Sequence, residues 1–183
     1  MLRLTAGTAI ATLAGCLGDD ADEPPAAEDP AGSGELGEPT TAVEVSITDM
    51  PSPEFVPGIV HLEPGGTVRW VVEGRRHEIS AYHPDAYGPQ RIPDGAEPWE
   101  SGLLRESGEF EWTFEAEGIY DYTDTRVLCA THEALGAVGR VVVGWPDPDD
   151  EPALDGSTAQ LPGRASTVMA EYDERTRELL QRT

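Results

Sequence analysis

The 183-residue sequence predicts an all-β protein, a β-sandwich or barrel, in its central part. Between residues 43 and 145, apolar and polar residues alternate in several short runs, which is the period of a half-buried strand. Turns rich in Gly and Pro, such as "PGGT", separate these runs, and no run has helical spacing. Short strands divided by turns, without helices between them, are typical of packed β-sheets.

Each expected strand rests on one alternating run. In the first, Val43, Val45 and Ile47 alternate with polar residues, as a half-buried strand requires. The other expected strands lie at 60–62, 68–72, 110–114, 118–122 and 141–143. The long segment 81–104 shows little alternation, and we expect it to wrap one side or end of the sandwich.

The N-terminus is typical of a lipoprotein signal peptide. Residues 1–16 contain one arginine, a short apolar stretch and the ending Leu13-Ala14-Gly15-Cys16. The apolar stretch is too short to cross a bilayer comfortably, which favours a signal sequence over a frayed apolar tail. The ending resembles a lipobox, so Cys16 is the expected lipidation site. Cys129 is then the sole thiol of the mature chain, and an intramolecular disulfide is excluded.

Two acidic segments flank the expected domain, which spans 43–145. Residues 17–42 are rich in Pro and Gly with few large apolar groups, and they predict a disordered acidic linker. Residues 146–163 predict a second linker. The tail 164–183 predicts a C-terminal amphipathic helix that docks back onto the sandwich, with partner binding as the alternative. Its apolar residues at helical spacing are Val168, Met169, Tyr172, Leu179 and Leu180.

The charge of the chain excludes one class of function. The formal net charge is −23, with 35 acidic and 12 basic residues, and every basic residue is arginine. Nucleic-acid binding needs a cationic surface that displaces counterions, so we expect no nucleic-acid partner. Many acidic residues with arginine in place of lysine resemble the composition of haloarchaeal proteins, whose surfaces stay hydrated in concentrated salt.

A Cys-x-x-His pair points to a metal. Cys129 and His132 lie in "LCATHEALGAVGR", just before the last expected strand, and His77 follows another strand in "GRRHEIS". The pair alone is also compatible with a buried cysteine beside a surface histidine. One thiolate and two imidazoles on loops at one end of a sandwich, however, form the ligand set of a trigonal copper site. Zinc can take the same three ligands.

These residues carry a family resemblance. From about Val43 to Trp145, the chain resembles the plastocyanin/azurin class of small blue copper proteins, and most closely the haloarchaeal halocyanins. The matching stretches are "PGGTVRWVVEGRRHEISAY", "RIPDGAEPWESGLL" and "EGIYDYTDTRVLCATHEALGAVGRVVVG". The resemblance implies a cupredoxin-like Greek-key β-sandwich, with His77, Cys129 and His132 as equatorial ligands of one copper ion.

The resemblance also implies a function. A protein of this class carries single electrons and is not an enzyme. With the lipid anchor, we expect a monomer on the extracellular face of the cell membrane that exchanges electrons with membrane-bound redox proteins of respiration. Electrons would pass through the edge of His132. The apolar patch expected around that edge includes Leu135, Ala137 and Val138.

Two departures from the family pattern bear on the site. The family usually has an axial Met five residues beyond the second His, and this position is Ala137. We expect a three-coordinate site with a raised reduction potential, or one completed by a water or a backbone carbonyl such as that of Arg76. The family also tends to have Tyr-x-Cys on one strand, whereas Tyr122 precedes Cys129 by seven residues. In an uninterrupted strand, residues an odd number apart point to opposite faces, so Tyr122 and Cys129 would face opposite ways. We therefore expect "TDTRV" to contain a bulge or a small excursion that restores a common face.

Other functions remain open at this level. One alternative is a cupredoxin-fold interaction module with a degenerate or absent copper site, and another is a copper carrier. A multicopper oxidase needs paired His-x-His or His-Cys-His segments, and the chain has only four His. A Cys-His nucleophile lacks an orienting acid in the "CATHEALGA" context. Of the remaining histidines, we expect His61 to be solvated on a strand and His83 to lie in a loop.

Overall fold

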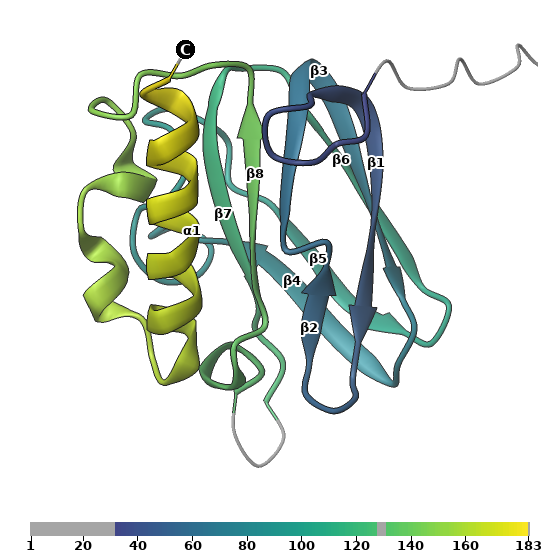
Figure 1. The fold of residues 1–183 in the computed structure, drawn as a ribbon. Coiled ribbons are helices and arrows are strands. Elements are labelled where there is room, and N and C mark those ends of the chain that lie inside the picture. The colour runs from purple at the N-terminus through teal and green to yellow at the C-terminus, as the bar shows by residue number, and fades with distance from the viewer. Residues whose placement is uncertain (1–31, 128–130, 183) are drawn as a thin grey trace, which may run out of the picture.

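The structure is a computed structural model, which describes residues 32–127 and 131–182. The expected signal peptide with Cys16, most of the first linker, and Cys129 lie outside the described residues. The described part holds eight strands, three 3-10 helices and one α-helix (Figure 1). They are β1 (Thr40–Thr48), β2 (Glu54–Val56), β3 (Ile59–Val72), β4 (Arg76–Ala81), β5 (Glu100–Arg105), β6 (Glu109–Phe114), β7 (Gly118–Asp124), η1 (Glu133–Leu135), β8 (Val138–Val143), η2 (Pro152–Leu154), η3 (Ser157–Gln160) and α1 (Arg164–Leu180).

The long strand β3 joins the two layers of the sandwich. Its first part, from Ile59 to Leu62, pairs with β8, and that layer continues through β7 and β4 to β5. Its second part, from Gly66, pairs with β6 on one side and with β1 on the other, and β2 follows β1. Pro64 and Gly65 lie between the two parts, where the strand passes from one layer to the other.

The core between the layers is rich in aromatic side chains. Trp70 is fully buried, and its ring centroid lies 5.0 Å from that of Trp99 and 5.2 Å from that of Tyr122. Tyr122 rests against Gly139 of β8, where an added Cβ would come within 2.2 Å of the tyrosine ring. A side chain at position 139 would therefore displace Tyr122, which stands two residues before the end of β7.

Several strands follow the expected alternation, and three were not predicted. In β1, Val45 and Ile47 are fully buried, as the alternation requires. The sequence did not predict β2, β4 or β5, and β5 lies inside the segment expected to wrap the sandwich. β2 and β5 are the two edges of the sheet order. The burial of β5 does not alternate, because an edge strand with charged ends is largely solvent-exposed.

Both predicted linkers contain ordered structure. Residues 32–38 form a turn in which the Gly34 N–H donates to the Glu38 carbonyl (3.0 Å), and β1 already begins at Thr40. The expectation of a linker at 146–163 was wrong in its second half. η2 and η3 lie there, and Leu154 and Leu161 are buried. These few apolar residues supply the burial that holds an otherwise acidic segment.

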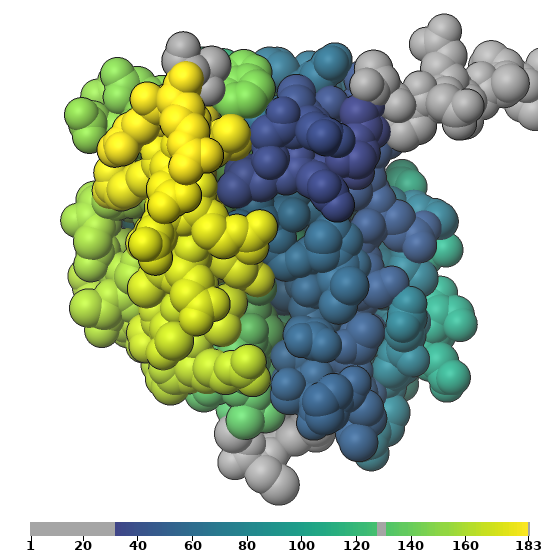
Figure 2. All heavy atoms as spheres, viewed as in Figure 1, coloured from purple at the N-terminus to yellow at the C-terminus, as the bar shows by residue number. Residues whose placement is uncertain are grey.

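The expected C-terminal helix is present as α1 and docks onto the sandwich. Ala165 and Met169 are fully buried against a cluster that includes Val138 of β8. Figure 2 shows the helix lying in the molecular surface beside the first strands. Two glycines lie directly against the helix. A Cβ added at Gly58 would be 2.0 Å from the Tyr172 hydroxyl, and one added at Gly37 would be 3.3 Å from the Leu179 side chain.

Candidate metal centre

Three side chains converge at one end of the sandwich. His77 is the second residue of β4, Asp124 is the last residue of β7, and His132 directly precedes η1. β4 and β7 are antiparallel neighbours in which Ile79 pairs with Asp124. Paired residues share a face, and so do residues two apart, so this register places His77 and Asp124 on the same face of the sheet.

The contact atoms of the three side chains lie close together. The Nδ1 atoms of His77 and His132 are each 2.6 Å from the same carboxylate oxygen, Oδ2 of Asp124. The imidazole centroids are 5.3 Å apart, and all three potential ligand atoms lie within 4.8 Å of one another. His77 and Asp124 are fully buried, and His132 is 3% exposed. An ionised carboxylate can only accept, so both Nδ1 atoms donate to Asp124.

The carboxylate of Asp124 is fixed by its other oxygen. Oδ1 accepts hydrogen bonds from the backbone N–H groups of Glu78 (3.1 Å) and Arg126 (3.0 Å), while Oδ2 points between the two imidazoles. Burial raises the pKa of Asp124, but hydrogen bonds from His132, His77 and the Arg126 N–H outweigh it and lower the pKa to about 2. The side chain is therefore an oriented anion at neutral pH.

The far nitrogen of His77 faces a second carboxylate. Its Nε2 is buried and lies 3.2 Å from Oδ1 of Asp49, but no described residue forms a well-aligned hydrogen bond with it. If Nδ1 held a metal, the ring proton would be on Nε2, beside the Asp49 carboxylate. A carboxylate behind the imidazole is a common support of a metal-bound histidine.

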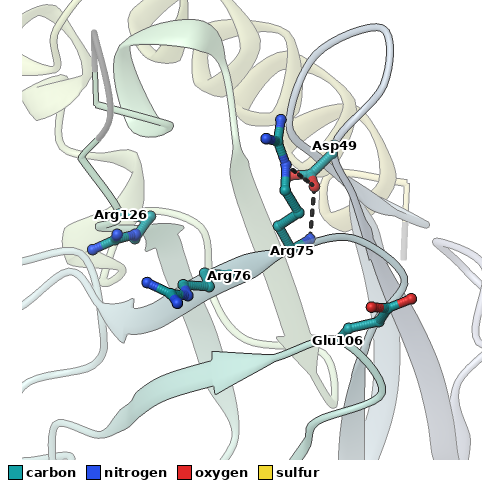
Figure 3. Close-up of a pocket in the computed structure, with 5 residues that line it drawn as sticks. All are labelled: Asp49, Arg75, Arg76, Glu106 and Arg126. Atoms are coloured by element: carbon teal, nitrogen blue, oxygen red, sulfur yellow. Dashed lines mark hydrogen bonds and ion pairs between the residues drawn. The ribbon is translucent and has the colours of Figure 1, made fainter.

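Asp49 also lines a hollow of about 370 Å³ beside this histidine. The other lining residues are Arg75, Arg76, Glu106 and Arg126. In Figure 3, Arg75 contacts Asp49, while Arg76 and Arg126 lie near one another across the hollow. The Arg75 backbone N–H donates to Oδ2 of Asp49 (2.7 Å), so the loop before β4 holds the carboxylate that faces His77.

The turn that carries His132 is anchored on both sides. The N–H of His132 donates to the Arg126 carbonyl (2.9 Å). The next residue, Glu133, is buried, and its carboxylate accepts hydrogen bonds from the hydroxyl groups of Tyr82 (2.8 Å) and Tyr87 (2.6 Å). Gly136 closes η1 with a φ of 104°, a left-handed conformation that favours glycine. His132 is thus held by contacts on either side of it.

The structure brings His77 and His132 together, while Cys129 lies outside the described residues. β7 pairs with β4 and β8 without a register shift as far as Asp124. The chain then leaves the sheet, and Val127 and Thr131 form an isolated bridge on either side of the undescribed residues. No bulge interrupts β7 itself. The expectation that a bulge or excursion turns the Cys129 side chain to the face of Tyr122 stays a prediction.

His61 and the expected apolar patch differ from prediction. His61 is fully buried, because the turn at 32–38 covers it: its Nδ1 accepts from the Gly37 N–H (3.0 Å), and its Nε2 contacts the Gly144 carbonyl (2.6 Å). Its solvated position was therefore a wrong prediction. Leu135 is 42% exposed, but Ala137 and Val138 are buried and contribute no apolar surface beside His132. His83 lies outside the named strands, as expected.

Sequence reasoning missed Asp49, Asp124 and Glu133. A signal for Asp124 was present in the spacing Tyr122-x-Asp124, because residues two apart on a strand share a face. No comparable signal existed for Asp49, which approaches His77 only after β1 and the loop before β4 have folded together.

Comparisons with known proteins support the fold. No known family model matches the sequence, and no curated protein matches it. Among solved structures, the pseudoazurin of Hyphomicrobium denitrificans has a TM-score of 0.56 at 23% identity, covering 73% of this chain and 97% of its own. That of Sinorhizobium meliloti has a TM-score of 0.55 at 21% identity, covering 72% and 93%. That of Methylobacterium extorquens has a TM-score of 0.52 at 20% identity, covering 75% and 98%.

At these identities the likeness concerns the fold. The expected all-β, cupredoxin-like sandwich with a C-terminal helix is confirmed. The histidine pair and Asp124 lie at one end of this sandwich, where β4, β7 and the turn before η1 meet.

Proposed function

We propose that the chain binds one copper ion between His77 and His132 and carries single electrons. The observation that carries this proposal is the convergence of two buried imidazoles. Their Nδ1 atoms each lie 2.6 Å from the same atom, Oδ2 of Asp124. Atoms bonded to one ion at about 2 Å each lie no more than about 4 Å apart, so only a small movement would bring the donor atoms onto a metal. Imidazole nitrogen is a good copper ligand.

The surroundings of the pair suit electron transfer. Copper would supply a one-electron couple between its two common oxidation states, and the protein would limit rearrangement of the ligands. His77 extends from a strand paired on both sides, and His132 is held by the anchored turn at Glu133. His132, at 3% exposure, is the more exposed of the two imidazoles and precedes the exposed Leu135 by three residues, so we propose it as the route of electrons to a partner.

The sequence supplies one further proposed donor and lacks one that the family usually has. Cys129 stays the predicted thiolate ligand from the family resemblance. Ala137 offers no thioether: its methyl group is buried, and its carbonyl accepts hydrogen bonds from the Asp124 N–H (3.0 Å) and the Thr123 hydroxyl (2.9 Å). The proposed centre therefore lacks an axial methionine at that position.

The cellular setting is proposed from the sequence. Lipidation at Cys16 would anchor the chain on the extracellular face of the cell membrane, where membrane-bound redox proteins are the proposed partners. Among the described residues, no helix combines the length and the apolar character needed to cross a bilayer. In this proposal the lipid and the acidic linker tether the domain within reach of its partners.

One specific observation favours a second candidate, a metal-free interaction module. The two imidazoles and Asp124 already satisfy one another by hydrogen bonds, and such a buried triad can lock the end of the sandwich without a metal. This alternative needs no copper and predicts that the histidines contribute to folding alone.

Equilibrium dialysis of the full-length chain against cupric ion separates the two candidates. We expect one copper ion per chain, loss of that ion in His77→Ala or His132→Ala, and its retention in His83→Ala, which serves as the matched control. Circular dichroism checks that each variant is folded. A folded chain that binds no copper, or copper binding that both histidine variants keep, would contradict the proposal and favour the module.

A further inference from the structure

We propose that Asp124 supplies the third donor atom of the metal centre, so that the site is formed by two imidazole nitrogens and one carboxylate oxygen. This inference rests on the proposed function, in which His77 and His132 bind the metal. It adds a ligand that the sequence did not predict, and this carboxylate oxygen takes the place of the Cys129 thiolate that the family resemblance implies, so the donor atoms are nitrogen and oxygen.

The position of Asp124 in β7 is the first argument. The strand is regular from Gly118 to Asp124, and Tyr122 and Asp124 are both fully buried. The residue two beyond a tyrosine on this strand is where the family resemblance would place a ligand cysteine, and here that residue is aspartate. The register with β4 places Asp124 on the face that carries His77.

The anchoring of the carboxylate is the second argument. Two backbone N–H groups hold Oδ1 and leave Oδ2 directed at the gap between the imidazoles. Carboxylates that ligate metals are themselves held by hydrogen bonds in this way. A metal can replace the imidazole protons at Oδ2 without disturbing the contacts that orient the side chain.

The charge around Asp124 is the third argument. Among residues 32–127 and 131–182, no arginine forms an ion pair with this fully buried carboxylate, and its side-chain partners are the two histidines alone. The other fully buried aspartate, Asp121, differs in this respect, because it pairs with Arg91 (2.9 Å) and Arg140 (2.7 Å). A partner charge stabilises a buried anion further, and a bound cation between the imidazoles would provide it.

The donor set has a chemical consequence. Carboxylate oxygen is a harder ligand than thiolate sulfur, so this site should hold Cu(II) in preference to Cu(I) and should also accept zinc. It should lack the intense visible absorption that arises when a thiolate transfers charge to cupric ion. Asp124 is then the residue that sets both the colour and the oxidation-state preference of the centre.

The test is the optical and electron paramagnetic resonance (EPR) spectrum of cupric-loaded full-length chain, in a Cys16→Ser background so that Cys129 is the only thiol. We expect a pale protein whose spectra and copper affinity change less than about two-fold in Cys129→Ser. Asp124→Asn, which preserves the shape, should weaken copper binding at least about ten-fold. Asp124→Cys combined with Cys129→Ser should acquire an intense visible band.

The failures of the two proposals differ. An intense band in the parent chain that disappears in Cys129→Ser would overturn the role of Asp124 while leaving copper binding at His77 and His132 intact. Copper affinity unchanged in folded Asp124→Asn would overturn it too. Absence of copper and zinc binding in the parent chain would instead refute the proposed function, and this inference with it.

Discussion

At the scale of single residues, Glu151 binds its proton more tightly than an ordinary glutamate. Burial, then the nearby charges of Asp121 and Glu117, raise its pKa to about 7, although the Ile119 N–H (2.8 Å) donates to it and Arg140 acts in the opposite direction. A raised pKa in the folded state stabilises the protein below the unfolded value of 4.5, and this stability is lost as the pH rises through about 7.

We predict that Glu151→Gln removes this pH dependence. Glutamine keeps an oxygen that can accept from the Ile119 N–H, but it cannot ionise. The variant should match the parent chain near pH 4.5 and exceed it above pH 7, with a gain in the free energy of unfolding of at most about 3 kcal/mol. Urea unfolding at both pH values measures the difference. A gain that is equal at the two pH values would contradict the assigned ionisation.

The candidate site shows which residues a sequence can reveal. His77 and His132 were predicted because each stands beside a recognisable strand or motif, and the structure places their rings 5.3 Å apart. Asp124 is one of 35 acidic residues. The pairing of β7 with β4 and hydrogen bonds from two backbone N–H groups place its carboxylate at the site. Those contacts exist only after folding, so the sequence could signal Asp124 only through its distance from Tyr122.

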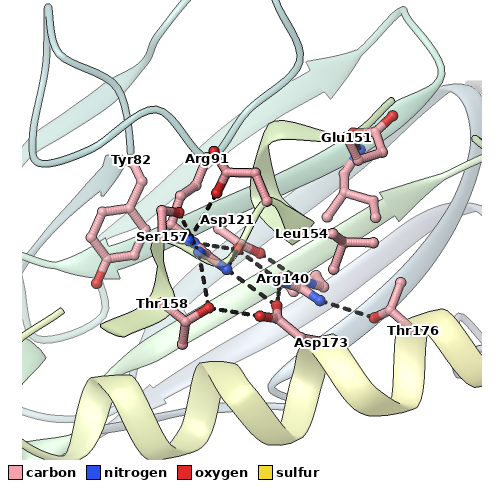
Figure 4. Close-up of polar contacts among 12 residues, drawn as sticks. Tyr82, Arg91, Asp121, Arg140, Glu151, Leu154, Ser157, Thr158, Asp173 and Thr176 are labelled. Carbon is pink, nitrogen blue, oxygen red and sulfur yellow. Dashed lines mark hydrogen bonds and ion pairs between the residues drawn. The ribbon is translucent and has the colours of Figure 1, made fainter. Parts of the chain in front are cut away.

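At the scale of elements, a buried charge network connects α1 to the sheet (Figure 4). Asp173 of the helix accepts from Arg140 of β8 (2.6 Å), from Arg91 (3.2 Å) and from the Thr158 hydroxyl (2.6 Å). Both arginines also pair with Asp121 of β7, so two positive and two negative charges balance between helix and sheet. Both arginine side chains are fully buried.

We predict that Asp173→Asn lowers the free energy of unfolding by about 3 kcal/mol, because it leaves two buried arginines with one carboxylate. The matched control is Glu178→Gln, on the same helix, whose exposed pair with Arg182 spans 3.3 Å and should contribute less than about 0.5 kcal/mol. Urea unfolding measures both variants, and limited proteolysis of the tail reports release of α1. Equal stability of the two variants would show that the network does not hold the helix.

The sequence predicted the helix but not the ordered structure in the segment before it, because the two depend on different contacts. The apolar spacing of α1 is visible in the sequence, and its buried Met169 confirms that spacing. The segment at 146–163 is ordered largely through contacts with residues far away in the chain. Ser157 and Thr158 of η3 accept hydrogen bonds from Arg91, for example, and no local pattern encodes such contacts.

At the scale of the whole molecule, the net charge of −23 should oppose folding in dilute salt. Folding brings acidic side chains closer together, and their repulsion extends over a Debye length of about 10 Å at 0.1 M salt but only about 3 Å at 1 M. We therefore predict that the thermal midpoint of unfolding rises as sodium chloride increases over this range. Differential scanning calorimetry at several salt concentrations measures this rise.

A charge-reduced variant separates screening from general effects of salt on hydrophobic burial. Asp94, Glu97 and Glu115 are exposed and have no hydrogen bond or ion pair among the described contacts, so changing them to Asn, Gln and Gln alters charge with little effect on packing. If repulsion limits stability, this triple variant should unfold at a higher temperature than the parent chain at 0.1 M salt, and the gap should close towards 1 M because screening then replaces the missing charges. A gap that persists at 1 M would mean that the acidic surface does not destabilise the fold through long-range repulsion.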